Sequence, residues 1–219
     1  MKFSFIVGNG NQGYMTRMCI YSMMKFNGDF VDEIIISDNS STDYTVEFIK
    51  ENKYKDITKV LTYDVPRDRN PKLYIPYGIQ WDLGLSNCKN EYALLSHADV
   101  QWRSNYLDYF CKTAYDKKPF LFGYGGGDGT HWQHRIHEWG MIIHVPTWKS
   151  LGVSFKGVPK KGGSYDTASY MYKQALEKNL TIASINREDQ DDNAFFFHYV
   201  GGAKWRKEII TEIAKKYTD

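Results

Sequence analysis

Strand-like apolar runs and helix-like stripes alternate along the first hundred residues. Short apolar runs bounded by turn-forming residues predict strands at 3–7, 32–38, 59–64 and 91–97. After the first run, apolar residues recur at spacings of three and four, which predicts a helix that ends at Asn27-Gly28. Further helices are expected after the polar turn at 40–42 and over 77–87. This alternation indicates a mostly parallel α/β sheet flanked by helices.

The second half of the chain is less regular and richer in glycine, histidine and tryptophan. An apolar run at 141–145 predicts a strand, and the lysine- and glycine-rich stretch at 155–164 is typical of a mobile loop. A helix is expected from Asp166, a short strand at 181–185, and a last helix over about 203–217. No repeat or linker interrupts the pattern. We therefore expect one domain over 1–219, with a nucleotide-binding half at 1–100 and a half for the other substrate at 101–219.

Composition excludes several classes of protein. The 219 residues are 42% hydrophobic and 25% charged, which is typical of a globular domain. A net charge of +2 provides no bulk basic field, so nucleic acid is not an expected partner. No apolar run approaches the roughly 20 residues that span a bilayer, so no transmembrane segment is expected. Three widely separated cysteines argue against a disulfide framework and favour a reducing, cytoplasmic location.

The turn after the first apolar run admits two interpretations. Gly8, Gly10 and Gly13 form a GxGxxG pattern between a predicted strand and a predicted helix, and Asp38 follows 25 residues after Gly13. This is the pattern of a Rossmann enzyme that binds NAD or S-adenosylmethionine. The large Met15 and Met18 oppose that interpretation, because close packing of helix on strand favours small residues there.

Several segments in order along the chain resemble the family 2 glycosyltransferases. The first strand and helix, the segment DEIIISDNSSTDYTVEFI (32–49) and the segment EYALLSHADV (91–100) fit that family. The segments YDTASYMYKQALEKNLTI (165–182) and FFFHYVGG (195–202) fit its acidic helix start and its late histidine. The resemblance covers nearly the whole chain. It implies the GT-A fold, with a single Rossmann-like, mostly parallel sheet, and an enzyme that moves a sugar from a nucleotide-diphospho-sugar.

The resemblance also assigns site residues. Asp99 and His198 would bind a divalent metal, and Asp166 would be the general base of an inverting transfer. Contacts to the nucleotide-sugar are expected from residues at the first, second and fourth strand ends and from the helix before the fourth strand: Val7, Gly8, Asn9, Asp38, Asn39, Ser40, Tyr77, His97 and Ala98. A UDP-sugar is the favoured donor, with GDP- and dTDP-sugars as alternatives.

Two departures from the family pattern leave a third interpretation open. The family's DXD triplet reads His97-Ala98-Asp99, and its acidic pair reads Tyr165-Asp166, so the first acid of each motif is missing. A chain that lacks these acids is also consistent with a non-catalytic module that binds sugar-nucleotides or glycans.

The residue types fit the expected chemistry. Carboxylate and phosphate oxygens suit Mg²⁺ or Mn²⁺, and an imidazole ligand is better tolerated by Mn²⁺. Asp166 at a helix start would stay ionised, as a base must at neutral pH. An asparagine- and serine-rich turn surrounds Asp38, so this carboxylate has either a turn-forming or a base-recognising role.

The acceptor is expected to be a saccharide or a glycolipid. Aromatic faces with polar tips suit sugar rings, and Trp132, His134, Glu138 and Trp139 are the candidates for that side of the site, with Glu138 as a second candidate base. Basic residues of the last helix leave room for peripheral contact with a membrane.

Overall fold

A computed structural model of the chain describes residues 1–43, 47, 51–65, 75–125, 135–155, 159–160, 163–164, 167–185 and 194–199. The helices expected after residue 42 and over 203–217 fall almost wholly outside these residues. All other predicted elements lie within or overlap them.

A seven-stranded sheet forms the centre of the molecule, in the order β10-β6-β7-β4-β1-β2-β3. Its strands are β1 (Phe3–Asn9), β2 (Val31–Asn39), β3 (Thr58–Tyr63), β4 (Tyr92–His97), β6 (Leu121–Tyr124), β7 (Met141–His144) and β10 (Ile182–Ile185). The four strands from the first half are mutually parallel, and β7 runs antiparallel to both β4 and β6. The predicted sheet, mostly parallel and flanked by helices, is confirmed.

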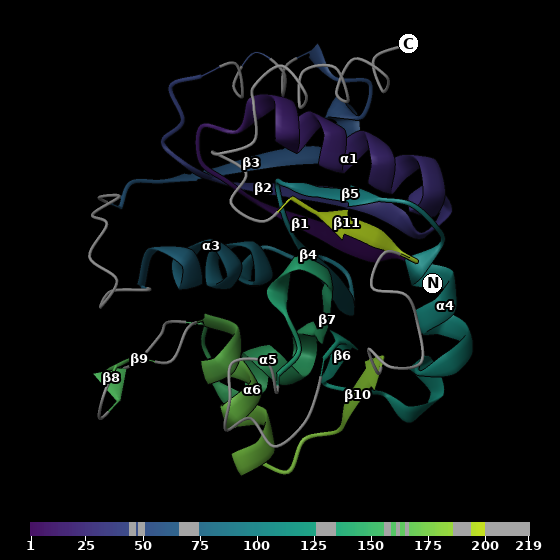
Figure 1. Cartoon of the computed structure of the whole chain (residues 1–219), viewed down its shortest axis with the longest axis vertical. Coiled ribbons are helices and arrows are strands. Elements are labelled where there is room, and N and C mark those ends of the chain that lie inside the picture. The colour runs from purple at the N-terminus through teal and green to yellow at the C-terminus, as the bar shows by residue number, and fades with distance from the viewer. Residues whose placement is uncertain are drawn as a thin grey trace.

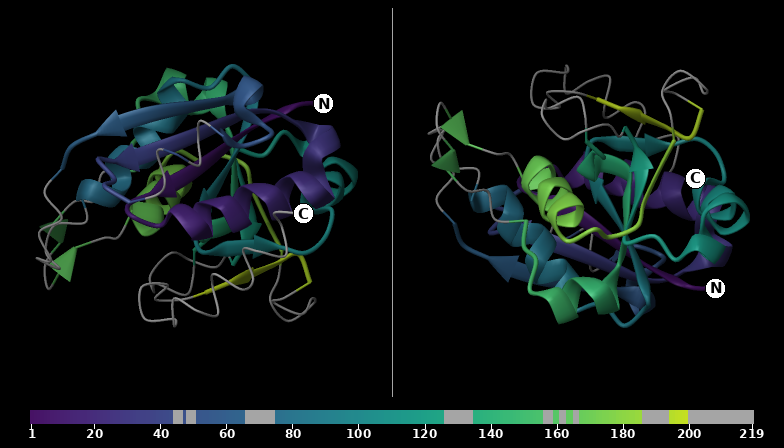
Figure 2. Two further views of the ribbon diagram at one scale, coloured as in Figure 1. Left: turned by 90° about the horizontal axis from the view of Figure 1, so that it is seen from above. Right: turned by 90° about the horizontal axis from the view of Figure 1, so that it is seen from below.

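Helices cover both faces of the sheet (Figures 1 and 2). They are α1 (Gly13–Asn27), α3 (Ile75–Ser86), α4 (Tyr106–Thr113), α5 (Val145–Leu151) and α6 (Thr167–Glu177). One buried core contains Phe3 and Phe5 of β1 with residues of α1 and α4. The other contains Ile6 of β1 with residues of α3, α5 and α6. Successive side chains of β1 thus enter opposite cores, as the period of two along a strand requires.

A second, two-stranded sheet joins distant parts of the sequence. Strand β5 (Val100–Trp102) pairs antiparallel with β11 (Phe196–His198), with Val100 opposite His198. Figure 1 shows this pair beside α1, and the Trp102 backbone N–H donates to Ser22 Oγ of that helix at 3.0 Å. The pairing therefore carries a segment near the C-terminus to the end of β4.

The hydrophobic pattern did not anticipate β5, β6, α4, α5 or β11. The run at 141–145 ends as a strand at His144, whose side chain accepts from Thr147 N–H and caps α5. Within the stretch expected to be a loop, β8 (Pro159–Lys160) and β9 (Gly163–Ser164) form a short antiparallel pair. Short elements of this kind carry little periodic signal.

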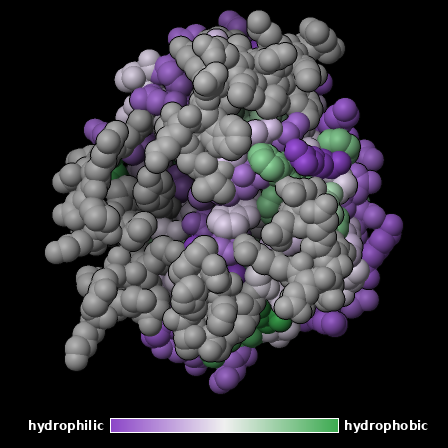
Figure 3. Space-filling model, viewed as in Figure 1, coloured by the Kyte–Doolittle hydropathy of each residue, from purple (hydrophilic) through white to green (hydrophobic). Residues whose placement is uncertain are grey.

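The surface seen in Figure 3 is mostly hydrophilic where described residues form it, with hydrophobic residues in small separate patches. Among the helices of the described residues, none combines the length and the apolar character needed to cross a membrane.

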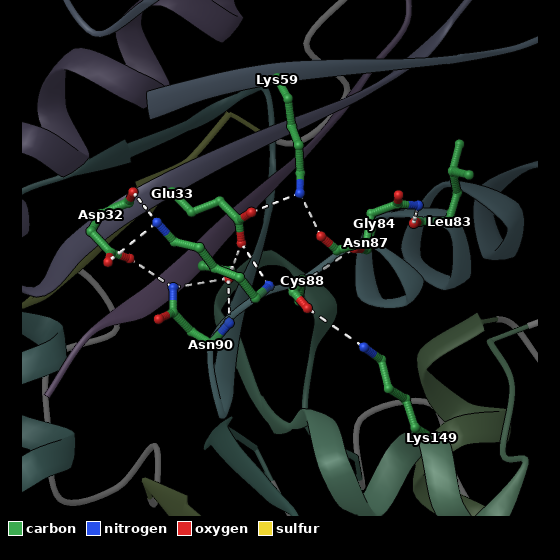
Figure 4. A network of polar contacts seen from close by, with 11 residues as sticks. Asp32, Glu33, Lys59, Leu83, Gly84, Asn87, Cys88, Asn90 and Lys149 are labelled. Carbon is green, nitrogen blue, oxygen red and sulfur yellow. Dashed lines mark hydrogen bonds and ion pairs between the residues drawn. The ribbon is translucent and has the colours of Figure 1, made fainter. Parts of the chain in front are cut away.

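A polar network ties strands together at the amino edge of the sheet (Figure 4). The buried carboxylate of Glu33 accepts from Lys59 Nζ at 2.7 Å, from Lys89 N–H at 3.1 Å and from the Ser4 hydroxyl. Burial on its own raises the pKa of Glu33, but the three donors together outweigh it, so this pKa lies below its usual value. One side chain of β2 thereby connects β1, β3 and the turn before β4.

A close backbone approach fixes the chain between β6 and β7. Gly125 has a φ of +106°, and its position is bridged to Ile136. A Cβ atom added at Gly125 would lie 2.0 Å from the carbonyl oxygen of Arg135. Only glycine fits here, because both the left-handed backbone and the contact exclude a side chain.

We predict that Glu33→Gln lowers the free energy of unfolding at pH 7 by about 1.5–3 kcal/mol, since hydrogen bonds to a charged group are lost. The depressed pKa of Glu33 in the folded protein makes its stabilisation complete above the unfolded-state pKa of about 4.3. That stabilisation is lost as the pH falls through the lower folded-state pKa. Denaturant unfolding of both proteins from pH 7 to pH 3 should show the difference shrinking. Glu177→Gln, at an exposed pair with Lys173, is the control, and equal stability of Glu33→Gln and wild type at pH 7 would contradict the prediction.

Two glycines with positive φ provide a second, matched prediction. Gly152 has a φ of +60°, and no atom of the described residues lies within 4 Å of an added Cβ. Gly152→Ala should therefore lower the free energy of unfolding by about 1 kcal/mol, the cost of a left-handed backbone for a residue with a side chain. In Gly125→Ala the new Cβ must also displace the Arg135 carbonyl, so the free energy of unfolding should fall by about 3 kcal/mol or more. Denaturant unfolding measures both, and similar losses for the two variants would show that the contact at Gly125 is unimportant.

Candidate active site

The carboxyl ends of β1, β2 and β4 meet at one edge of the sheet. Gly8 lies opposite Ser37 of β2 and His97 of β4, and Asn9 lies opposite Asp38. In open α/β sheets, ligands bind at this edge. The structure thus places together the strand-end residues that the sequence predicted.

Side chains interlock the two loops that leave β1 and β2. Asn9 Nδ2 donates to Asp38 Oδ1 at 2.6 Å, and Thr42 N–H donates to Asn11 Oδ1 at 2.7 Å. The Ser41 backbone N–H donates to Asp38 Oδ2 at 2.9 Å, and the Ser41 hydroxyl also contacts this carboxylate. Asp38 is 3% exposed. Its carboxylate therefore holds the turn together, which is the first of the two roles considered for it; contact with a nucleobase stays a prediction.

The start of α1 has its own carboxylate partner. Gly13 N–H donates to Asp43 Oδ2 at 2.9 Å. In a Rossmann dinucleotide site the pyrophosphate occupies such a helix start. Here a protein carboxylate takes that place, and the buried Met15 and Met18 fill the helix face beneath it. Together with antiparallel β7 beside β4, this arrangement argues against the NAD or S-adenosylmethionine interpretation of the GxGxxG turn.

Helix α3 packs two side chains against the same edge. Gln80 is buried against Gly8, and a Cβ atom added to Gly8 would lie 2.5 Å from the Gln80 side chain. Trp81 is fully buried and stacks on His97, with ring centroids 5.6 Å apart and planes 13° apart. Val7 and Ala98 are fully buried, backbone included, and their contact with a nucleotide-sugar stays a prediction. Trp81 is a site residue to which the sequence gave no role.

Three candidate metal ligands converge just beyond β4. His198 Nε2 lies 3.2 Å from Asp99 Oδ1, and His97 Nδ1 lies 3.9 Å from the same oxygen. One ligand atom from each of the three residues falls within 4.8 Å of the other two. The pairing of β5 with β11 produces this arrangement, since it sets Val100 opposite His198 and Tyr199 N–H donates to the Asp99 carbonyl at 2.9 Å. His97 thus joins the two residues that the sequence assigned to the metal.

The charges of this group suit a cation. Burial alone raises the pKa of Asp99, but the hydrogen bond from His198 and the two nearby imidazoles outweigh it, so the pKa is lowered. Burial is the main cause that lowers the pKa of His97. At neutral pH the group therefore offers a carboxylate and a neutral imidazole, which are the forms that bind metals. His198 Nδ1 is buried and has no hydrogen-bond partner among the described residues, and this donor set fits a divalent metal ion.

A buried ion pair lies behind His97. Glu138, in a 3₁₀ turn over Glu138–Gly140, accepts from Arg135 Nη1 at 2.9 Å, and its other oxygen lies 3.8 Å from His97 Nε2. Burial opposes its ionisation, but Arg135 and His97 prevail and lower the pKa of Glu138 to about 2. A carboxylate with a lowered pKa is a weaker base, which counts against Glu138 as a second candidate base, and that role stays a prediction. The spacing of three residues between Arg135 and Glu138 was a sequence signal for this ion pair, but the burial of the pair could not be predicted from the sequence.

Aromatic rings enclose the other side of the group. Trp139 stacks on His198 with ring centroids 4.7 Å apart, and His137 stacks on Trp139 at 3.9 Å. Trp139 therefore lies beside the three candidate ligands, and its contact with an acceptor stays a prediction. Asp166, Trp132 and His134 lie outside the described residues, as does the side chain of Tyr77. Asn39 Nδ2 donates to the Val65 carbonyl, just after β3, and the Ser40 hydroxyl donates to the carbonyl of Tyr63, the last residue of β3.

Comparison with protein families gives one match over most of the chain. The sequence model of glycosyl transferase family 2 matches residues 4–180. The matched range includes Asp38, Asp99 and Asp166, whereas His198 lies beyond it. No curated protein matches the sequence.

Solved structures with the same architecture include several that are distant in sequence. TarS of S. aureus in complex with UDP has a TM-score of 0.64 and 17% identity, over 99% of this chain and 65% of that one. The mannosyltransferase PcManGT of Pyrobaculum calidifontis, in complex with GDP-Man and Mn²⁺, has a TM-score of 0.62 and 12% identity, over 84% and 55%. The galactosyltransferase LgtC, with donor and acceptor sugar analogues, has a TM-score of 0.62 and 11% identity, over 99% and 97%.

These similarities establish the predicted GT-A fold. The chain spans 36–65% of the length of the TarS chains, so it corresponds to part of those proteins.

Proposed function

The chain belongs to glycosyltransferase family 2, and from this premise we propose that it transfers a sugar from a nucleotide-diphospho-sugar to a saccharide acceptor. The observation that carries the proposal is the convergence of His97, Asp99 and His198 at the edge where parallel strands end. That edge is where a nucleotide would lie in an open α/β sheet.

We propose that these three residues hold a divalent cation, with Mn²⁺ favoured over Mg²⁺. Two imidazoles and one carboxylate suit Mn²⁺ better than Mg²⁺, which prefers oxygen ligands alone. The PcManGT structure, which contains GDP-Man and Mn²⁺, supports a cation in this fold. A bound cation would neutralise the negative charge that develops on the departing diphosphate.

The donor is proposed to be a UDP-sugar, with its nucleoside against the interlocked loops at Asn9 and Asp38. TarS structures contain UDP or UDP-GlcNAc, which supports a UDP-sugar, while the GDP-Man of PcManGT keeps a GDP-sugar as the alternative. The backbone at Gly8, with buried Gln80 beside it, forms the floor between the loops and His97. A rigid floor of this kind would hold the anomeric carbon in one orientation toward the acceptor.

Asp166 is the proposed general base. The described part of α6 begins at Thr167, whose hydroxyl lies 3.4 Å from Glu138 Oε1, so the chain next to Asp166 reaches the same cluster. A carboxylate at a helix start remains ionised and able to take the proton of an acceptor hydroxyl. One base and a single displacement would invert the anomeric carbon. Trp139 is the proposed aromatic surface for the acceptor.

We predict that UDP, and not GDP, dTDP, NAD or S-adenosylmethionine, raises the melting temperature of the chain, and only when Mn²⁺ is present. A ligand that binds the folded state stabilises it by mass action. Asp99→Ala should abolish the shift, because it removes the carboxylate toward which both imidazoles point. Thermal denaturation measures all combinations.

Asp108→Ala is the matched control, since Asp108 forms an exposed pair with Lys112 on α4. A full UDP shift in Asp99→Ala would exclude this residue from the site. A metal-independent shift with NAD or S-adenosylmethionine would replace the proposed function by the Rossmann alternative.

We predict that Asp166→Asn lowers kcat by about 10²–10⁴-fold and leaves the affinity for UDP unchanged, because general-base catalysis contributes about that much. Hydrolysis of UDP-sugars in the absence of acceptor, together with transfer to a panel of saccharides, measures the rate. Wild-type protein that binds UDP with Mn²⁺ and turns over none of the tested UDP-sugars would favour the non-catalytic module.

A further inference from the structure

Glu138 is held from three sides. Arg135 Nη1 donates to Oε2 at 2.9 Å, while Thr167 Oγ1 and His97 Nε2 face Oε1 at 3.4 and 3.8 Å. Its side chain is 12% exposed and that of Arg135 is 7% exposed. The direction of this carboxylate is therefore fixed by contacts from three separate segments of the chain.

The two oxygens of Glu138 have different partners. Arg135 pairs with Oε2, which leaves Oε1 directed at the imidazole of His97. The opposite nitrogen of that ring, Nδ1, faces Asp99 at 3.9 Å. Trp81 stacks on the ring and limits its rotation. His97 thus lies between two carboxylates, with one ring nitrogen toward each.

We propose that Glu138 is a positioning residue that acts through His97: it accepts the Nε2 proton and leaves Nδ1 to bind the cation. Metal-bound histidines commonly have a carboxylate behind the ring, and this second carboxylate sets the tautomer and the ring orientation. The inference rests on the proposed function, since it requires that His97 binds a cation.

The placement also accounts for the missing acid of the triplet. His97 stands where a first carboxylate would bring a negative charge beside Asp99. Glu138, which lies 41 positions after His97 in the sequence, supplies a negative charge on the other side of the His97 ring from Asp99. Through Thr167 the same carboxylate also contacts the first residue of α6.

The test is a double-mutant cycle on metal binding by the whole chain, without nucleotide. Titrations with Mn²⁺ by calorimetry and with Co²⁺ by its visible absorption compare wild type, Glu138→Gln, His97→Ala and the double variant. We expect Glu138→Gln to weaken binding about 10–100-fold, as loss of such a partner does at other metal sites. In the His97→Ala background the same change should alter affinity less than about twofold, because the residue through which Glu138 acts is gone.

Glu177→Gln, on the exposed face of α6, is the control and should match wild type. If Glu138→Gln does not fold, Glu138→Asp keeps the charge beside Arg135, and its weaker binding than wild type is then the supporting result. Unchanged affinity in the folded Glu138 variant, or an equal loss with and without His97, overturns the proposal. If the wild type binds neither ion, both the role of Glu138 and the proposed metal site are overturned. If the wild type binds the ions and the Glu138 variants bind them equally well, only the role of Glu138 is overturned.

Discussion

The site depends on the parallel pairing of β1 with β2 on one side and with β4 on the other. Every residue of β1 is buried, and its alternating side chains enter the two separate cores. A slip of one residue would exchange these faces, so burial fixes the register. That register sets Gly8 beside His97 and Asn9 beside Asp38. The position of the polar residues at the carboxyl edge is therefore a consequence of apolar packing within the sheet.

Carboxylates at the amino ends and at the carboxyl ends of the strands have different partners. At the amino edge, Glu33 is satisfied by three donors that link neighbouring strands. At the carboxyl edge, Asp99 faces the imidazoles of His97 and His198, and within the described part of the chain His198 Nδ1 has no hydrogen-bond partner. Glu33 is thus fully engaged in linking strands, whereas the group around Asp99 keeps a ring nitrogen without a partner among the described residues.

The sequence predicted the elements whose signal is local. The strands and helices of the first hundred residues have clear periods, and their ends marked Asp38 and Asp99 correctly as strand-end residues. The proximity of His198 to Asp99 came from the family resemblance, since β5 and β11 have three residues each and nearly a hundred residues lie between them. The role of Glu138 was not predictable, because burial beside Arg135 depends on contacts between distant segments.

The antiparallel direction of β7 has a consequence for how the site is assembled. Met141, the first residue of β7, lies opposite Leu95 near the end of β4, so the chain passes the site as it enters the sheet. Glu138 and Trp139 belong to the segment that leads into β7, whereas Asp38 and His97 lie at the carboxyl ends of β2 and β4. The proposed metal site therefore takes its ligands and their surroundings from two kinds of chain segment, one that ends parallel strands and one that begins an antiparallel strand.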